Sequence, residues 1–218
     1  MVYISLLLSS SLLRPSNSST VIQEAKKRRD AGLALIGYFY FDFRNTAKQD
    51  VRGLLTSLLA QFSAKSDHCY HILSELYSTH DAGSQQPSNA TLAECLKKIL
   101  KLPGLPGIYI IVDALDECPN TSGVPTARET VLELLEDLVS LEHPNLHICI
   151  TSRPEMDIRT ILEPLASFHI SLHNEIGQKN DIRDYISTFV HSDRRMRRWR
   201  AEDKQLVIDI LSTKVNGM

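Results

Sequence analysis

The sequence predicts an α/β domain in which a parallel sheet is flanked by helices in three layers. Three apolar runs, at 33–43 (LALIGYFYFDF), 108–112 (IYIIV) and 146–150 (LHICI), are typical of strands that are covered on both faces. Between the first two lies 50–62 (DVRGLLTSLLAQF), whose apolar residues recur at helical spacing. Strands that alternate with helices need crossover connections, and these favour parallel pairing.

The remaining elements follow the same alternation. Residues 168–172 form a further expected strand, and other helices are expected at 20–31, 71–78, 90–101, 129–141, 156–162, 181–190 and 202–214. We expect residues 1–17 to be a divergent segment in which 2–8 (VYISLLL) serves as a replacement first strand, 18–176 to be the α/β core, and 177–218 to begin a helical segment. The domain is expected to be incomplete at both ends.

Composition indicates an ordinary globular chain. Of the 218 residues 43% are apolar and 23% charged, and the net charge of −2 gives no general reason to expect nucleic acid or anionic lipid as a partner. The apolar run 2–8 is too short to span a membrane as a helix. The four cysteines show neither zinc-ligand nor paired spacing, which predicts reduced thiols in a cytoplasmic protein.

One basic run stands out from this balance. Five arginines between 194 and 200 surround Met196 and Trp199. A patch for nucleic acid or nuclear import is one interpretation. The neighbouring acids Asp193, Glu202 and Asp203 favour a solvated, partly paired helix surface instead.

The strongest candidate for chemistry is the acidic sequence that ends the strand at 108–112. It reads VDALDE and contains Asp113, Asp116 and Glu117. A strand of this kind places Asp113 at the carboxyl edge of the sheet, where it can hold Mg²⁺, and the next two acids can orient or deprotonate a water. Three carboxylates this close repel one another unless a cation lies among them. The alternative interpretation is an ordinary acidic surface turn.

A second polar group follows the strand at 146–150. It contains Thr151 and Arg153, which adjacent parallel strands would bring to the edge that carries Asp113. A guanidinium there suits a terminal phosphate. The alternative for Arg153 is a loop arginine that pairs with a surface acid.

Together, IYIIVDALDEC and ICITSRPE resemble the Walker B and sensor 1 segments of NACHT-type NTPases of the signal-transducing STAND class, in particular the fungal NOD-like receptors. The resemblance extends over about 18–217. It implies Mg²⁺ at Asp113, water activation by Asp116 and Glu117, and binding of an ATP or GTP phosphate near Thr151 and Arg153. It also implies possible self-association or association with related NACHT proteins, with neither nucleic acid nor a membrane favoured.

The phosphate-binding half of such a site is missing. A P-loop needs G-x-x-x-x-G-K-[ST] after the first strand, and none of the nine glycines precedes a lysine. The sequence therefore predicts a truncated or degenerate NACHT NTPase-like module with weak or no nucleotide binding, and leaves its enzymatic activity open. Two alternatives remain, which are a competent NTPase with an unorthodox phosphate loop and a structural fragment without function.

Overall fold

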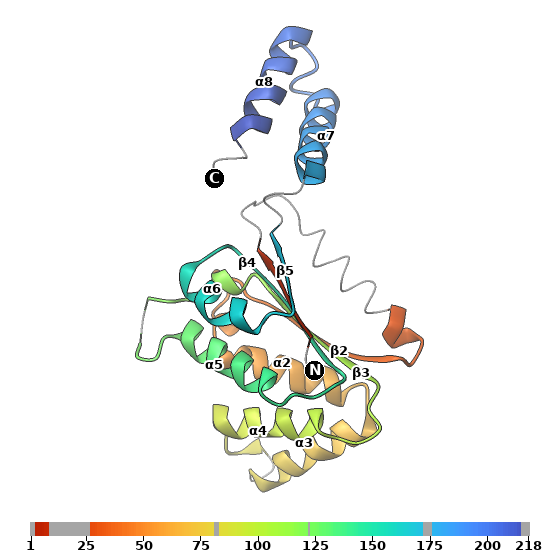
Figure 1. Ribbon diagram of the computed structural model, residues 1–218, viewed down its shortest axis with the longest axis vertical. Coiled ribbons are helices and arrows are strands. Elements are labelled where there is room, and N and C mark those ends of the chain that lie inside the picture. The colour runs from red at the N-terminus through yellow and green to blue at the C-terminus, as the bar shows by residue number, and fades with distance from the viewer. Residues whose placement is uncertain (1–2, 9–26, 81–82, 122, 172–175, 215–218) are drawn as a thin grey trace.

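The described part of the chain forms a five-stranded parallel sheet, with strands in the order β2-β3-β4-β1-β5 (Figure 1). The computed structural model describes residues 3–8, 27–80, 83–121, 123–171 and 176–214, and for β1 it describes the backbone alone. The strands are β1 (Tyr3–Leu8), β2 (Ala34–Tyr40), β3 (Gly107–Asp113), β4 (Leu146–Ser152) and β5 (Phe168–Ser171). The predicted α/β class with a parallel sheet flanked by helices is confirmed. Within the apolar run 2–8, residues Tyr3–Leu8 form β1, which lies between β4 and β5.

The helices agree with the predicted periods, and side-chain caps fix the starts of α2, α3, α4 and α5. They are α2 (Val51–Ser63), α3 (Asp67–Thr79), α4 (Asn89–Leu100), α5 (Ala127–Val139), α6 (Met156–Leu162), α7 (Ile176–Ser192) and α8 (Ala201–Lys214). Short 3-10 turns occur at η1 (Thr46–Lys48), η3 (Leu115–Glu117) and η4 (Glu163–Leu165). Helix α3 begins four residues earlier than predicted because the Ser66 side chain caps its first turn.

The helix predicted at 20–31 falls mostly outside the described residues. Its last turn, 27–30, is helical. Gly32 follows two residues after the helix ends, and its φ of +72° is the left-handed conformation that glycine adopts without strain.

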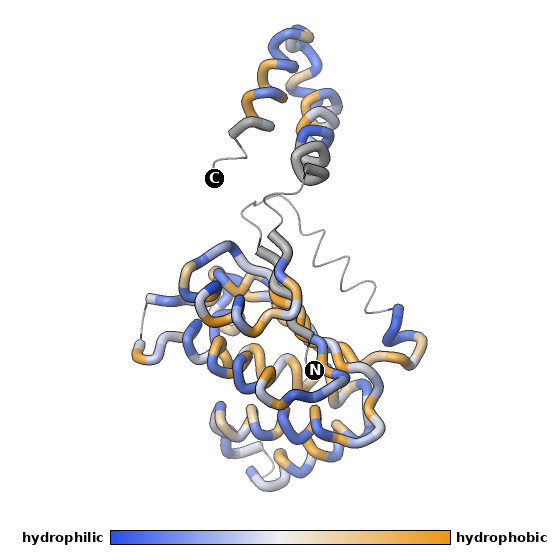
Figure 2. Tube along the Cα trace, in the orientation of Figure 1, coloured by the Kyte–Doolittle hydropathy of each residue, from blue (hydrophilic) through white to orange (hydrophobic). Residues whose placement is uncertain are grey.

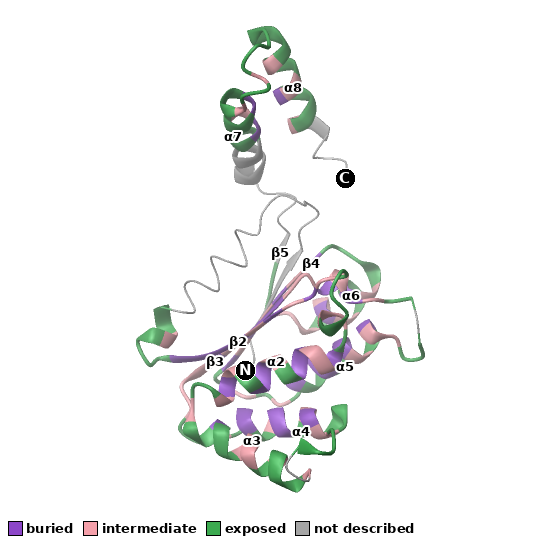
Figure 3. Ribbon diagram, turned by 180° about the vertical axis from the view of Figure 1, so that it is seen from behind, coloured by how far each residue is buried: buried purple, intermediate pink, exposed green. Residues whose placement is uncertain are grey.

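The main core lies on one face of the sheet (Figure 3). Helices α2, α5 and α6 supply buried aliphatic side chains to it, and α3 and α4 pack beneath α2 as a further layer (Figure 1). Apolar positions therefore gather along the inner sides of these helices and along the central strands (Figure 2). Full burial of one such side chain contributes about 1.5–3 kcal/mol.

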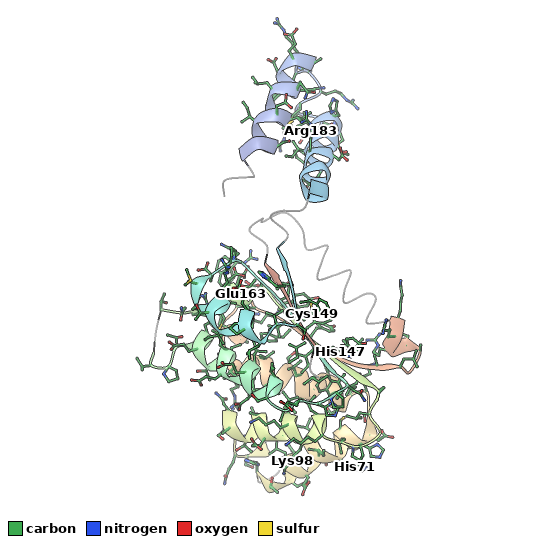
Figure 4. All side chains as sticks on the ribbon, viewed as in Figure 1. His71, Lys98, His147, Cys149, Glu163 and Arg183 are labelled. Atoms are coloured by element: carbon green, nitrogen blue, oxygen red, sulfur yellow. The ribbon has the colours of Figure 1, made fainter. Side chains whose placement is uncertain are left out.

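The apolar cluster on the opposite face of the sheet is smaller than the main core and richer in aromatic residues. Ala34, Ile36 and Ile111 are buried there, and Tyr38, Tyr40, Tyr109 and Cys149 pack around them. Figure 4 labels His147 and Cys149, which both lie on β4. The Tyr109 and His147 rings stack with centroids 4.6 Å apart.

Helices α7 and α8 form a hairpin that stands beyond the sheet (Figure 1). Ile186, Val190 and Ile208 make a small core between them, and Arg183 pairs with Asp209 at 2.8 Å. The arginine-rich run forms the turn of this hairpin. The interpretation of that run as a helix surface was therefore wrong, because α7 ends at Ser192 and α8 begins at Ala201.

Candidate functional site

The candidate site lies at the carboxyl ends of β3 and β4. These strands pair in parallel, with Val112 opposite Ile150, so the residues that follow both strands emerge at one edge of the sheet. Asp113 is the last residue of β3, and Arg153 directly follows β4. The expected meeting of the two polar segments is thus present in the structure.

Thr151 connects Asp113 to the turn that follows β3. Its hydroxyl donates a short hydrogen bond to Oδ1 of Asp113 and accepts one from the backbone N–H of Ala114 at 3.0 Å. Ala114 has a left-handed conformation, with φ 54° and ψ 46°. A non-glycine residue pays about 1–2 kcal/mol for that conformation, so surrounding contacts must hold the turn in place.

Asp116 faces Arg153 instead of open solvent. The Asp116 side chain is 8% exposed, and its Oδ2 lies 2.9 Å from Nε of Arg153, whose side chain is 52% exposed. The backbone N–H of Arg153 donates to Oδ1 of the same carboxylate at 2.9 Å. Both carboxylate oxygens of Asp116 are therefore engaged by one residue.

Glu117 faces a third direction. Its Oε2 accepts a hydrogen bond from the backbone N–H of Phe43 at 3.2 Å, across from the end of β2. The three carboxylates thus have three different partners, which relieves the repulsion expected from their spacing. Within the described part of the chain, no group of three or more His, Cys, Asp or Glu side chains is arranged to hold a metal ion.

The negative charge of Asp113 is felt by two neighbouring side chains. Burial, and after it the Asp113 carboxylate, raises the pKa of Tyr40, which stands opposite Asp113 in the strand register. The same two causes, in the same order, raise the pKa of Cys149 to about 11. Both side chains therefore stay neutral at physiological pH.

Arg128 is the residue that sequence reasoning missed. It is 8% exposed and its guanidinium donates to two backbone carbonyls, from Nη2 to Asp116 O at 2.6 Å and from Nε to Cys118 O at 2.9 Å. It also pairs with Asp157 of α6 at 3.1 Å. A signal was present, because a cation in the first turn of a helix opposes the helix dipole and needs partners of its own.

The oxygen atoms available at this edge suit a hard cation but do not enclose one. The Asp113 carboxylate and the Thr151 hydroxyl are the types of ligand that Mg²⁺ accepts, with water and phosphate oxygens filling the other positions. When bound, such an ion would neutralise phosphate charge. The end of β1 lies alongside, since Leu7 and Leu8 stand opposite Thr151 and Ser152. The carboxyl end of β1 therefore lies beside the carboxyl end of β4, which Arg153 follows.

Comparison with known proteins assigns the part of the chain that carries this edge to a family. A family profile described as "Nephrocystin 3, N-terminal" matches residues 17–153, a range that contains all five predicted site residues. The chain belongs to this nephrocystin-3 N-terminal family. No curated protein matches the chain.

Two solved structures are among those similar to this nephrocystin-3 N-terminal family member, and only the first is similar enough to bear on the fold. The Orc1 protein of Aeropyrum pernix, solved in complex with DNA, has a TM-score of 0.52 and 15% identity, and the match covers 86% of this chain and 43% of that one. The Drosophila origin recognition complex bound to DNA has a TM-score of 0.42 and 11% identity, with 99% and 49% covered. The chain thus spans less than half the length of either structure.

The family match and the Orc1 likeness together support a P-loop NTPase-like domain, as the sequence predicted. The finer assignments to Walker B, sensor 1 and the fungal NOD-like receptors stay predictions. So do the roles of Asp113, Asp116, Glu117, Thr151 and Arg153. None of the described helices is long and apolar enough to cross a membrane.

Proposed function

We propose that this chain is a degenerate NACHT NTPase-like module of a signal-transducing, NOD-like protein, with weak or no nucleotide binding on its own. The observation that carries the proposal is the contrast between the two halves of one edge. Asp113, Thr151, Asp116 and Arg153 gather where a metal and a terminal phosphate would lie. The sequence after β1, from Ser9 to Ser16, has no G-x-x-x-x-G-K-[ST].

The absence of a P-loop should lower nucleotide affinity by more than the remaining site residues can restore. Backbone N–H groups and a lysine supply most phosphate contacts in a P-loop, and each charge-assisted hydrogen bond contributes about 1.5–3 kcal/mol. Every 1.4 kcal/mol changes the dissociation constant about tenfold, so the loss of several such bonds weakens binding by orders of magnitude. One donor of the Arg153 guanidinium, Nε, is also already engaged by Asp116.

Isothermal titration with ATP and GTP, each with Mg²⁺, tests this proposal. The unmodified chain should show no micromolar binding. The triple variant Ser9→Gly/Arg14→Gly/Pro15→Lys creates G-S-S-L-L-G-K-S after β1, because Ser16 already occupies the last position of the motif. This variant should gain binding, and the further change Asp113→Ala should remove most of that gain.

The other outcomes distinguish the alternatives. Micromolar binding by the unmodified chain that Asp113→Ala abolishes would establish a competent NTPase-like switch and end the degenerate interpretation. If the triple variant folds but does not bind, the edge at Asp113 is not a nucleotide site. A chain that shows no cooperative thermal transition would instead favour a fragment without independent function.

Association with related NACHT-type domains is the remaining part of the proposal. If nucleotide does not control this module, it acts by contact with other copies or relatives. Light scattering over a range of concentrations, with and without Mg²⁺–ATP, measures self-association. An oligomer whose size is independent of nucleotide is the expected result.

A further inference from the structure

The turn between α7 and α8 carries an unusual concentration of unpaired positive charge. Arg194, Arg195, Arg197, Arg198 and Arg200 are all exposed. Among the described residues, none of their guanidinium groups forms an ion pair. By contrast, six of the eight other described arginines have a carboxylate within 3.3 Å. Since the run contains arginine and no lysine, it offers planar donor groups that suit phosphate oxygens.

The acids next to the run are engaged elsewhere. Oδ1 of Asp193 accepts a hydrogen bond from the backbone N–H of Arg195 at 2.7 Å and so fixes the turn. Glu202 and Asp203 lie in the first turn of α8, where carboxylates interact favourably with the helix dipole. The five arginines outnumber these three acids, which interact with the backbone of the turn or with the dipole of α8. The turn therefore keeps a net positive charge.

The turn is anchored, and its one exposed aromatic residue lies among the charges. Met196 packs against the hairpin core of Ile186, Val190 and Ile208. The Trp199 backbone N–H donates to Met196 O at 3.1 Å, and the Trp199 side chain stays 44% exposed. An indole between Arg198 and Arg200 provides a flat apolar surface at the centre of a polycationic loop.

We propose that this turn, residues 193–200, binds single-stranded nucleic acid, with the arginines on the phosphates and Trp199 stacked on an unpaired base. Five guanidinium groups suit a ligand with repeated negative charges, and an aromatic ring among them is the usual platform for bases without sequence preference. A membrane surface fits less well, because helices that lie on membranes present a long apolar face whereas Met196 is turned inward here. The proposal concerns a surface separate from the candidate nucleotide site and does not depend on it.

The chain offers a direct readout, because Trp199 is its only tryptophan. Titration of the protein with unlabelled dT20 and with rU20 should quench its indole fluorescence if a base stacks on Trp199. Anisotropy of the same oligonucleotides, labelled with a dye, should give the dissociation constant. With up to five phosphates neutralised, the plot of log affinity against log salt should have a slope of about −3.

Variants separate the proposed contacts from general electrostatics. Arg195→Gln/Arg197→Gln/Arg198→Gln should weaken binding at least tenfold, and Trp199→Leu should weaken it roughly tenfold while leaving the salt slope unchanged. The control Lys65→Gln/Lys98→Gln/Lys101→Gln removes the same charge from exposed sites on other parts of the fold. Figure 4 shows Lys98 on the helical layer farthest from the hairpin that carries Arg183. This control should leave affinity within about twofold, since charges beyond a Debye length are screened.

Three results would overturn the proposal. One is equal loss of binding in the lysine control, which would indicate non-specific attraction. Another is binding without any change in Trp199 fluorescence, which would exclude base stacking. The third is binding to phosphatidylcholine–phosphatidylserine vesicles but to neither oligonucleotide, which would make the turn a membrane contact. Circular dichroism melts of each variant confirm that the hairpin remains folded.

Discussion

Arg153 holds the buried carboxylate of Asp116 with two of its own groups, the guanidinium Nε and the backbone N–H, each at 2.9 Å. This arrangement ties the turn after β3 to the residue that follows β4. It also means that Arg153 is already bound in the absence of any phosphate. Movement of its side chain to a ligand would leave Asp116 with the backbone hydrogen bond and a long one, 3.5 Å, from the Ser152 hydroxyl.

Loss of the Arg153 side chain should destabilise the fold measurably. Arg153→Ala leaves a carboxylate that is 8% exposed without its cation, and we expect the free energy of unfolding to fall by about 1–2 kcal/mol, reduced from the buried-pair value because Arg153 is half exposed. Urea unfolding followed by circular dichroism measures the change.

Arg44→Ala is the matched control for this prediction. Arg44 pairs with Asp42 at 3.3 Å, and its own side chain is 77% exposed. An exposed pair of this kind contributes little to stability, so Arg44→Ala should leave the urea midpoint nearly unchanged. If the two variants lose equal stability, the Asp116–Arg153 contact contributes no more to the free energy of unfolding than an exposed ion pair does.

Arg128 should matter more, because one buried guanidinium binds two backbone carbonyls and a carboxylate at once. Arg128→Met keeps much of the buried stem but removes the donor to the carbonyls of Asp116 and Cys118. It also leaves the Asp157 carboxylate with Asn120 as its donor and without a cation. We expect a loss of about 2–4 kcal/mol in the free energy of unfolding. Arg128→Lys should recover only part of it, since one ammonium group cannot reproduce the fixed geometry of three guanidinium nitrogens.

The control for Arg128 is Arg159→Met. This change removes the ion pair between Arg159 and Glu163, which is 2.8 Å long and more exposed than the 3.1 Å pair between Arg128 and Asp157. Chemical denaturation of both variants gives the difference directly. A loss below about 1 kcal/mol for Arg128→Met would show that water replaces the guanidinium at the turn.

Gln61 protects the open edge of the sheet. Strand β2 is an edge strand, and the Gln61 side chain accepts from Tyr38 N–H at 3.1 Å and donates to Tyr38 O at 2.7 Å, as a neighbouring strand would. Gln61→Ala should therefore lower the free energy of unfolding by about 1–2 kcal/mol and increase aggregation on heating. Gln61→Glu should be no better, because an ionised carboxylate cannot donate to Tyr38 O. Turbidity and urea midpoints check both, and full stability in Gln61→Glu would contradict the edge-cap interpretation.

The sequence was sufficient for the architecture because the relevant signals are local. Apolar runs and helical spacing depend on neighbours in the chain, and so does the end of β3 at Asp113. The pairing of β3 with β4 followed from their parallel character, and it brought Thr151 to Asp113 as expected.

What the sequence did not reveal depends on contacts between distant segments. Arg128 and Asp157 are 29 positions apart, and the partners of Asp116 and Glu117 are 37 and 74 positions away from them. No periodicity encodes such pairs. The arginine run was misassigned for a related reason, because charge pattern alone cannot distinguish a helix surface from the turn between two helices.

Alkaline pH should destabilise the protein through its buried thiols. Burial and the Asp113 charge raise the pKa of Cys149 to about 11, whereas an unfolded thiol ionises near roughly pH 8.5. Between these values the unfolded chain releases a proton that the folded chain keeps, so the free energy of unfolding falls as pH rises. The contribution is fully present below the unfolded pKa. Burial raises the pKa of Cys118, Cys69 and Cys95 in the same direction.

Urea midpoints measured from pH 7.5 to pH 10 test this dependence. The wild-type curve should decline above about pH 8.5, and Cys149→Ala should decline less steeply because it removes one of the four contributing thiols. Asp113→Asn should also flatten the curve, since it removes the charge that opposes the Cys149 thiolate. Native-state labelling with iodoacetamide at pH 8.5 provides an independent measure. Modification of Cys149 at the rate of free cysteine would show that its thiol ionises normally and that the pH dependence has another origin.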